Sequence, residues 1–136
     1  MKSKILFTFG VIFFLVMSYS FILKSSSEGD PWVAPEKYQK MENPVTADGE
    51  SIAIGKTLYG KHCKSCHGKE GLGDGSKAAQ LDTPSGDFTS EEFISQSDGS
   101  IYYKTIEGRD DMPSFKKKIP DADDIWSIVN YIRTLE

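Results

Sequence analysis

Both cysteines and both histidines of this 136-residue chain lie within six consecutive positions, the stretch HCKSCH at residues 62–67. Thiolate and imidazole groups bind soft and borderline metals, and thiols can also bond covalently to cofactors. Cys63, Cys66 and His67 form a C-x-x-C-H pattern. This spacing is compatible with three kinds of chemistry: a zinc site, a thiol–disulfide redox pair, and covalent attachment of haem.

The first two alternatives fit the chain poorly. Structural zinc takes four protein ligands, usually as two separated pairs, and four ligands within six residues cannot easily surround one ion. A thioredoxin-like pair belongs to a βαβ unit, and no strand pattern longer than a few residues is visible. Haem attachment explains the spacing, because positions i, i+3 and i+4 share one side of a helical turn. Cys63 and Cys66 could hold one porphyrin edge there while His67 reaches the iron.

A second iron ligand is available in Met112, within the stretch GRDDMPSF between two predicted helices. Methionine is more often a core residue than a ligand, but two aspartates and a proline flank this one. Met1 and Met17 lie in an N-terminal apolar run, and Met41 lies in a proline-containing segment. His62 neighbours the attachment site and cannot cross to the opposite side of the iron. Met112 is therefore the predicted second axial ligand.

The elements that must position these residues are predicted to be helices, and the predicted fold class is all-α. One helix is expected to begin near Asp48, whose carboxylate can cap it, and to run through residues 49–62. Shorter helices are expected at residues 90–96, capped by a serine, and at residues 100–106, ended by a glycine.

The clearest helix is expected at the C-terminus, over residues 120–136. Acidic residues fill its first turn, where the helix dipole favours them. Ile125, Ile128, Val129 and Ile132 follow the i, i+3, i+4, i+7 spacing of a buried helix face. We therefore expect this helix to supply much of the core.

The N-terminus predicts export across a membrane. An uncharged run of nineteen residues, 5–23, follows two lysines and ends before a third. A transmembrane helix needs roughly 17–25 residues, whereas a cleaved signal has a shorter apolar stretch of about 7–15 residues. The predicted organisation is a membrane anchor or signal peptide over residues 1–23, a linker over residues 24–47, and one domain over residues 48–136.

Composition limits the partners of that domain. The chain has 16 basic and 20 acidic residues, a net charge of −4, and this argues against nucleic acid because phosphate binding needs a basic face. Hydrophobic residues make up 38% of the chain, and part of them lies in the N-terminal run. The remaining core is small, and small domains often need a disulfide, a metal or a cofactor for stability.

From about Asp48 to Leu135, the chain resembles the class I c-type cytochromes, the mono-haem cytochrome c family. Four stretches carry the resemblance in order: GKTLYGKHCKSCHG, GLGDG, DMPSF and IWSIVNYIRTL. The resemblance implies a cytochrome c fold, with several helices around one covalently bound haem c. It also implies that a small residue, Gly55, allows the N-terminal and C-terminal helices to cross closely, with Tyr59 packed near Ile128 and Tyr131.

The resemblance also assigns roles to the site residues. Cys63 and Cys66 would form the thioether bonds, and His67 and Met112 would be the axial ligands of the iron. The family usually has a proline whose carbonyl accepts a hydrogen bond from the ring of the proximal histidine. Pro84 is the only proline between His67 and Met112.

A haem iron with two protein ligands has no open position for a substrate, so we expect an electron-transfer protein rather than an enzyme. It would carry single electrons at the outer face of the cytoplasmic membrane, or in the periplasm if the signal is cleaved. Its partners would be a quinol-oxidising or dehydrogenase complex and a terminal oxidase or reductase. The alternatives are a cytochrome subunit of a larger oxidoreductase or terminal oxidase complex, and a haem enzyme that reacts with peroxide or small gases.

A group of basic residues close to Met112 suggests where a partner would dock. Lys116, Lys117 and Lys118 follow Met112, and Arg109 precedes it. This set could form a positive rim that steers an acidic partner, or it could be a solvated surface turn.

Overall fold

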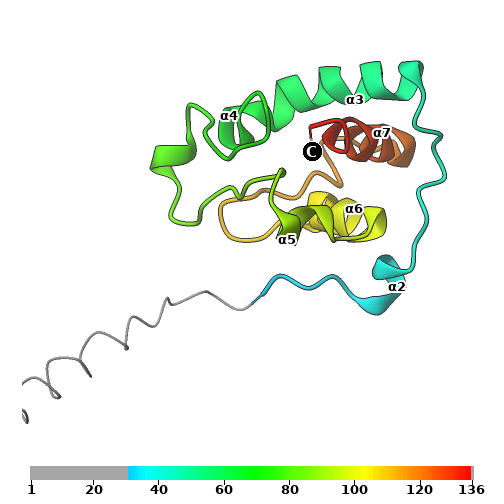
Figure 1. The fold of residues 1–136 in the computed structure, drawn as a ribbon, viewed down its shortest axis with the longest axis horizontal. Helices are drawn as coiled ribbons and strands as arrows, with labels where there is room; N and C mark the ends of the chain where they lie inside the picture. The colour runs from blue at the N-terminus through cyan, green and yellow to red at the C-terminus, as the bar shows by residue number, and fades with distance from the viewer. Residues whose placement is uncertain (1–30, 136) are drawn as a thin grey trace, which may run out of the picture. The chain divides into compact units, whose positions relative to one another are not determined.

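A computed structural model describes residues 31–135, and all its regular elements are helical (Figure 1). The elements in chain order are α2 (Glu36–Gln39), α3 (Gly49–His62), α4 (Lys64–His67), the 3₁₀ turn η1 (Ala78–Gln80), α5 (Glu91–Ile94), α6 (Asp98–Glu107) and α7 (Ala122–Ile132). The all-α prediction is confirmed for this part of the chain, where β pairing is limited to an isolated bridge between Arg109 and Met112.

The chain divides into two units, Met1–Trp32 and Val33–Glu136, and the second contains every helix described here. The predicted anchor or signal peptide over residues 1–23 lies outside the described residues. Within residues 31–135, no helix has the length and apolar character needed to cross a bilayer.

Helix α3 begins where the sequence predicts, because Asp48 forms a capping box. The Asp48 carboxylate accepts hydrogen bonds from the backbone N–H groups of Glu50 and Ser51, at 3.1 and 2.9 Å. The backbone N–H of Asp48 in turn donates to Ser51 Oγ at 3.2 Å. These bonds satisfy N–H groups that have no partner within the helix, and they fix the start of the element that leads to the C-x-x-C-H stretch.

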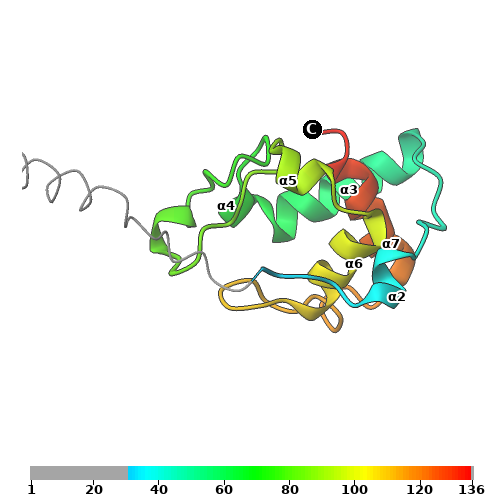
Figure 2. The ribbon, with the colours of Figure 1, turned by 60° about the horizontal axis from the view of Figure 1, so that its bottom comes forward.

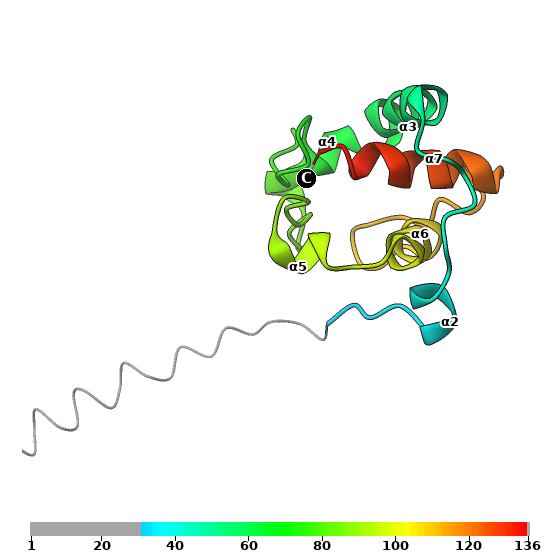
Figure 3. The ribbon, with the colours of Figure 1, turned by 45° about the vertical axis from the view of Figure 1, so that its right-hand side comes forward.

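Helix α7 packs across α3, and this crossing forms the centre of the fold (Figures 1 and 3). The predicted stripe of Ile125, Ile128, Val129 and Ile132 is buried, with at most 5% of each residue exposed. Gly55 lies where the helices come closest: a Cβ atom there would stand 1.9 Å from the Ser127 carbonyl oxygen. The predicted role of Gly55 in a close helix crossing is therefore confirmed.

Helices α5 and α6 are present, but α5 ends at Ile94, two residues before its predicted end, and α6 begins earlier than predicted. Ser90 caps α5 through a 3.3 Å hydrogen bond from the Phe93 N–H. Helix α6 begins at Asp98, two residues before the predicted start, because Ser97 caps it by accepting from the Ser100 N–H. It ends at the predicted Gly108.

Residues 33–47 differ from the predicted linker, because they fold onto α6 and α7. Pro35 precedes α2 as its N-cap, where a proline is compatible with a helix, although prolines break helix interiors. Helix α2 packs on α6, and the Tyr38 and Tyr103 rings lie 4.8 Å apart (Figure 2). Asn43 Nδ2 donates to Asn130 Oδ1 of α7 at 2.7 Å. We call residues 33–47 the N-terminal strap.

The close crossing predicts that Gly55→Ala destabilises the protein. The added methyl group would overlap the Ser127 carbonyl, so α3 and α7 would have to separate, at a cost of about 2–3 kcal/mol in the free energy of unfolding. Denaturant titration followed by circular dichroism measures this cost.

Gly60→Ala is the matched control, because Gly60 is also in α3 and nothing lies within 4 Å of its Cβ position. It should raise the free energy of unfolding by up to about 1 kcal/mol through helix propensity. Equal effects of the two substitutions would contradict the role assigned to Gly55.

Candidate haem-binding site

The C-x-x-C-H stretch forms one tight helical turn directly after α3. Cys63 lies between the two helices, as the C-cap of α3 and the N-cap of α4. The Cys63 carbonyl accepts hydrogen bonds from the N–H groups of Cys66 at 3.1 Å and His67 at 3.0 Å. The predicted i, i+3 and i+4 relation among Cys63, Cys66 and His67 is therefore present in the backbone.

The following glycine-rich loop fixes this turn by satisfying the carbonyls at the end of α4. The N–H groups of Lys77, Gly75 and Gly73 donate to the carbonyls of Ser65, Cys66 and His67, at 2.8, 3.1 and 2.9 Å respectively. The last carbonyls of a helix have no partner within the helix, so an external partner stabilises them. The loop therefore holds the backbone of the turn rigidly without using any of its three candidate side chains.

The two thiols are free, and their environments differ. Cys63 is 9% exposed, and burial raises its thiol pKa to about 12, with a smaller effect from the neighbouring Cys66. Cys66 is half-buried. The Cys63 side chain is thus a neutral thiol held against the core.

The His67 ring is held in an apolar environment that keeps it neutral. It stacks on Phe88 with 4.7 Å between ring centroids and 28° between the planes. Burial lowers the pKa of His67 to about 4, and the backbone of Ser85 raises this pKa by a smaller amount. A neutral imidazole is the form that binds metals.

His67 Nδ1 is buried and makes no hydrogen bond of normal geometry. The backbone group acting on the ring belongs to Ser85, the residue after Pro84. Phe88 and Ser85 are contacts of the site that sequence reasoning missed. No motif marks Ser85, and Phe88 is one of several aromatic residues in the chain.

Tyr59 connects α3 to the end of the C-x-x-C-H turn. Its hydroxyl donates to the Gly68 carbonyl at 2.8 Å, and its ring lies 5.2 Å from that of Tyr131 on α7. The predicted contact of Tyr59 with Tyr131 is confirmed. Burial, followed by nearby groups that include Cys63, raises the pKa of Tyr59, so the hydroxyl stays protonated and can donate.

Met112 lies in a second rigid turn, on the segment that follows α6. Its N–H donates to the Arg109 carbonyl and its carbonyl accepts from the Arg109 N–H, both at 2.9 Å. Gly108 has a φ of +70°, and a Cβ atom there would stand 2.5 Å from the Met112 carbonyl oxygen. Ser114 Oγ then ties the segment to α6 by donating to the Ile106 carbonyl at 2.6 Å.

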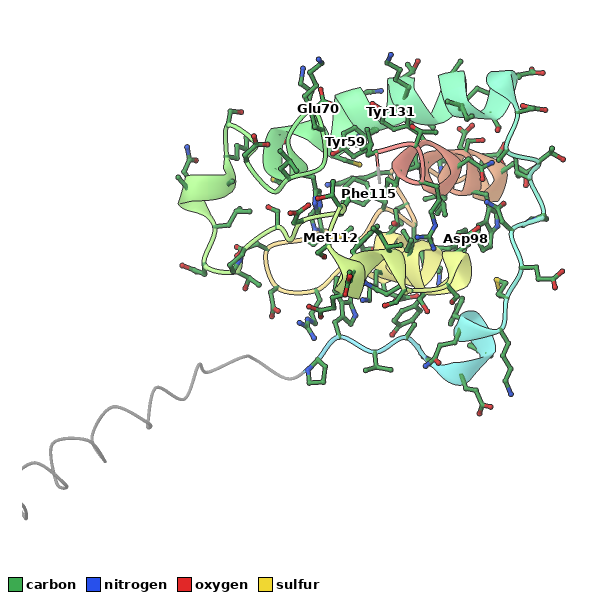
Figure 4. The ribbon with its side chains drawn as sticks, in the orientation of Figure 1. Tyr59, Glu70, Asp98, Met112, Phe115 and Tyr131 are labelled. Atoms are coloured by element: carbon green, nitrogen blue, oxygen red, sulfur yellow. The ribbon has the colours of Figure 1, made fainter. Side chains whose placement is uncertain are left out.

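The Met112 turn follows α6, whereas the C-x-x-C-H turn follows α3, and these two helices do not contact each other. In Figure 3 the segment after α6 runs between α6 and α7, on the side of α7 opposite α3. Figure 4 shows Met112 below Tyr59, on the segment that also carries Phe115. The Met112 side chain is half-buried and packs against the core cluster.

These groups suit a haem better than a metal ion held by protein alone. The donor set consists of two free thiols on one turn, a neutral imidazole with an unpartnered buried nitrogen, and a thioether from a separate segment. Thiols, imidazole and thioether are the groups that c-type haem attachment and His/Met ligation require. Among residues 31–135, no group of three or more His, Cys, Asp or Glu side chains is arranged to hold a metal ion.

Aromatic residues on α6, α7 and the segment after α6 pack against one another and against α3. Trp126 is 3% exposed and stacks on Tyr102 with 4.1 Å between ring centroids, so it joins α7 to α6. The His62 ring packs edge-on against Phe115 at 5.9 Å.

The hydrogen bond of Tyr59 leads to a testable prediction. Tyr59→Phe should lower the free energy of unfolding by about 1 kcal/mol, because the buried Gly68 carbonyl loses its partner while the ring packing is kept. Tyr131→Phe is the control, since the structure records no hydrogen bond of its hydroxyl within residues 31–135. A similar loss in both variants, measured by denaturant titration, would contradict the assignment.

Comparison with known proteins agrees with this site. Residues 50–132 match the family described as "Cytochrome C oxidase, cbb3-type, subunit III". A structure of the reducing HAO-like protein complex from Kuenenia stuttgartiensis has a TM-score of 0.62 and 29% sequence identity, over 70% of this chain and 49% of that chain.

A second relative matches over a shorter stretch. The quinohemoprotein alcohol dehydrogenase ADH IIB of Pseudomonas putida is 47% identical over 38 residues, which are 28% of this chain and 6% of the dehydrogenase. The chain thus spans about half of the chain of the similar structure and a small part of the curated relative. Because the family match covers most of the described residues, this chain belongs to the c-type cytochromes, in the family described as cytochrome c oxidase, cbb3-type, subunit III.

Proposed function

We propose that this protein binds one haem c covalently through Cys63 and Cys66, with His67 and Met112 as axial ligands, and that it carries single electrons. The observation that carries this proposal is the pairing of two rigid turns, one with the C-x-x-C-H residues and one with Met112. A neutral, buried His67 ring on the first turn is ready to act as a ligand without losing a proton.

The haem supplies an iron that alternates between the ferrous and ferric states. The residues of the chain determine what that iron can do. Histidine with methionine favours a higher reduction potential than more electron-donating ligand pairs. Two ligands held by backbone-fixed turns also leave no open position for a substrate, which favours electron transfer over catalysis on the haem.

A second candidate is a cytochrome subunit of a larger oxidoreductase or terminal oxidase complex. The similar proteins favour this candidate, because they are described as an oxidase subunit, a dehydrogenase and a protein complex. The site residues would have the same roles in both cases. Co-purification with a large partner distinguishes the subunit from the free carrier.

We further propose that residues 1–23 anchor the haem domain at the outer face of the cytoplasmic membrane. Because the N-terminal strap starts at Val33 and belongs to the folded unit, nine residues, 24–32, would separate the proposed anchor from that unit. Nine extended residues reach at most about 32 Å. The electron partners would then be membrane-bound complexes, such as a quinol-oxidising or dehydrogenase complex and a terminal oxidase or reductase.

An absorption spectrum of the holoprotein tests the ligand assignment. Protein made in a host that attaches c-type haem should be low-spin when oxidised, with the weak red band of a methionine–iron bond. Met112→Ala should abolish this band, whereas Met41→Ala should keep it, because Met41 lies in the N-terminal strap and is exposed. His67→Ala should disturb the spectrum and His62→Ala should not.

A high-spin wild-type spectrum that changes readily with added ligands would contradict the carrier proposal. An open iron of that kind would favour the alternative of a haem enzyme acting on peroxide or small gases. Persistence of the red band in Met112→Ala would reject Met112 as the ligand.

Basic residues from two segments support a docking surface for an acidic partner. The positive charges of Lys61 and Lys118, after the larger effect of burial, lower the pKa of His62, which places both lysines near one ring. Lys116 and Lys117 directly precede Lys118 and are exposed. We define the basic surface as Lys61 and Lys116–Lys118.

Reversing the charge of Lys116–Lys118 to glutamate should slow electron transfer to the physiological partner by about tenfold or more at low salt and flatten the dependence on ionic strength. Stopped-flow kinetics over a series of salt concentrations measures both effects. Charge reversal of Lys37 and Lys40 in the N-terminal strap is the control. Unchanged rates and salt dependence in the Lys116–Lys118 variant would reject the basic surface as the docking site.

A further inference from the structure

One hydrogen bond joins the segment that carries Met112 to the segment that passes the His67 ring. The backbone N–H of Thr83 donates to Asp111 Oδ2 at 2.8 Å, across 28 positions of sequence. Both residues are exposed, so packing in the core does not bring them together. It is charge-assisted, because a carboxylate is the acceptor, and such bonds are stronger than those between neutral groups.

Each end of this bond is close to a proposed iron ligand. Asp111 directly precedes Met112, and the paired hydrogen bonds between Arg109 and Met112 make their turn rigid. Thr83 lies two residues before Ser85, whose backbone acts on the His67 ring. A shift of Asp111 would therefore be transmitted to Met112.

The loop that contains Thr83 has few other attachments. The Thr83–Asp111 bond connects residues 82–86 to the Met112 segment, and the backbone of Ser85 acts on the His67 ring. Ser85 Oγ is buried there without a partner. Asp111 therefore supplies a direct hydrogen-bonded link between this loop and the Met112 turn.

We propose that Asp111 is a positioning residue that locks the Met112 turn to residues 81–87 and so keeps the Met112 thioether on the haem iron. This inference rests on the proposed His67/Met112 ligation. Asp111 touches neither the sulfur nor the iron; it fixes the distance between two segments that would lie on opposite sides of the haem. Its loss would make Met112 easier to displace by an added ligand.

Imidazole binding to the oxidised holoprotein tests the proposal, because imidazole must replace Met112 to bind. Asp111→Ala should bind imidazole about tenfold more tightly, the effect of losing one hydrogen bond of about 1.4 kcal/mol, and its red methionine–iron band should weaken. Asp111→Asn keeps an oxygen that can accept from the Thr83 N–H, so its affinity should stay close to that of the wild type. The haem content of every variant is also measured, to verify that each variant has bound haem fully.

Asp82→Ala is the matched control for charge, because Asp82 is an exposed aspartate next to Thr83 with no hydrogen bond in the described structure. An equal change in Asp82→Ala and Asp111→Ala would overturn the proposal, since the effect would then be one of charge alone. An Asp111→Ala variant with wild-type imidazole affinity and red band would also overturn it while leaving Met112 ligation intact. A wild-type holoprotein without the red band would overturn the ligation and this inference together.

Discussion

The close crossing of α3 and α7 at Gly55 is the constraint on which the rest of the domain depends. Helix α3 ends at Cys63, so its position on α7 determines where the C-x-x-C-H turn lies. Helix α7 also packs on α6 through the stacked rings of Trp126 and Tyr102, and α6 leads into the Met112 turn. The relative placement of the two proposed axial ligands is thus set by one helix that contacts both of the others.

A consequence of this arrangement is that the helices leading to the two proposed ligands do not contact each other directly, although Phe115 packs on the His62 ring. Helix α4 packs on α3 and η1, and neither α3 nor α4 packs on α6. In a domain of this size a single hydrophobic core is small, and an additional apolar group in its interior adds much of the missing burial. A porphyrin held by Cys63, Cys66 and His67 would therefore add to the core as well as supply the redox centre.

The sequence predicted those parts of the fold whose causes are local. The Asp48 capping box and the isoleucine stripe of α7 each depend on residues within two helical turns, and both are present. The docking of α2 was not predicted, because it depends on the contact of Tyr38 with Tyr103, 65 positions away. For the same reason the contacts of Ser85 with His67 and of Thr83 with Asp111 could not be read from spacing: both join loops that meet only in the folded chain.

The two turns that carry the proposed ligands are held mainly by backbone hydrogen bonds, and this matters for the proposed electron transfer. The carbonyls of α4 are satisfied by the N–H groups of the glycine-rich loop, and Met112 is paired with Arg109 through two backbone bonds. Bonds of this kind do not involve the donor side chains, so the sulfur and imidazole groups remain available for the iron. An iron that changes charge between fixed ligands needs little structural rearrangement. If His67 and Met112 are the iron ligands, as proposed, fixing their backbones before the haem is bound would favour rapid exchange of electrons over exchange of ligands.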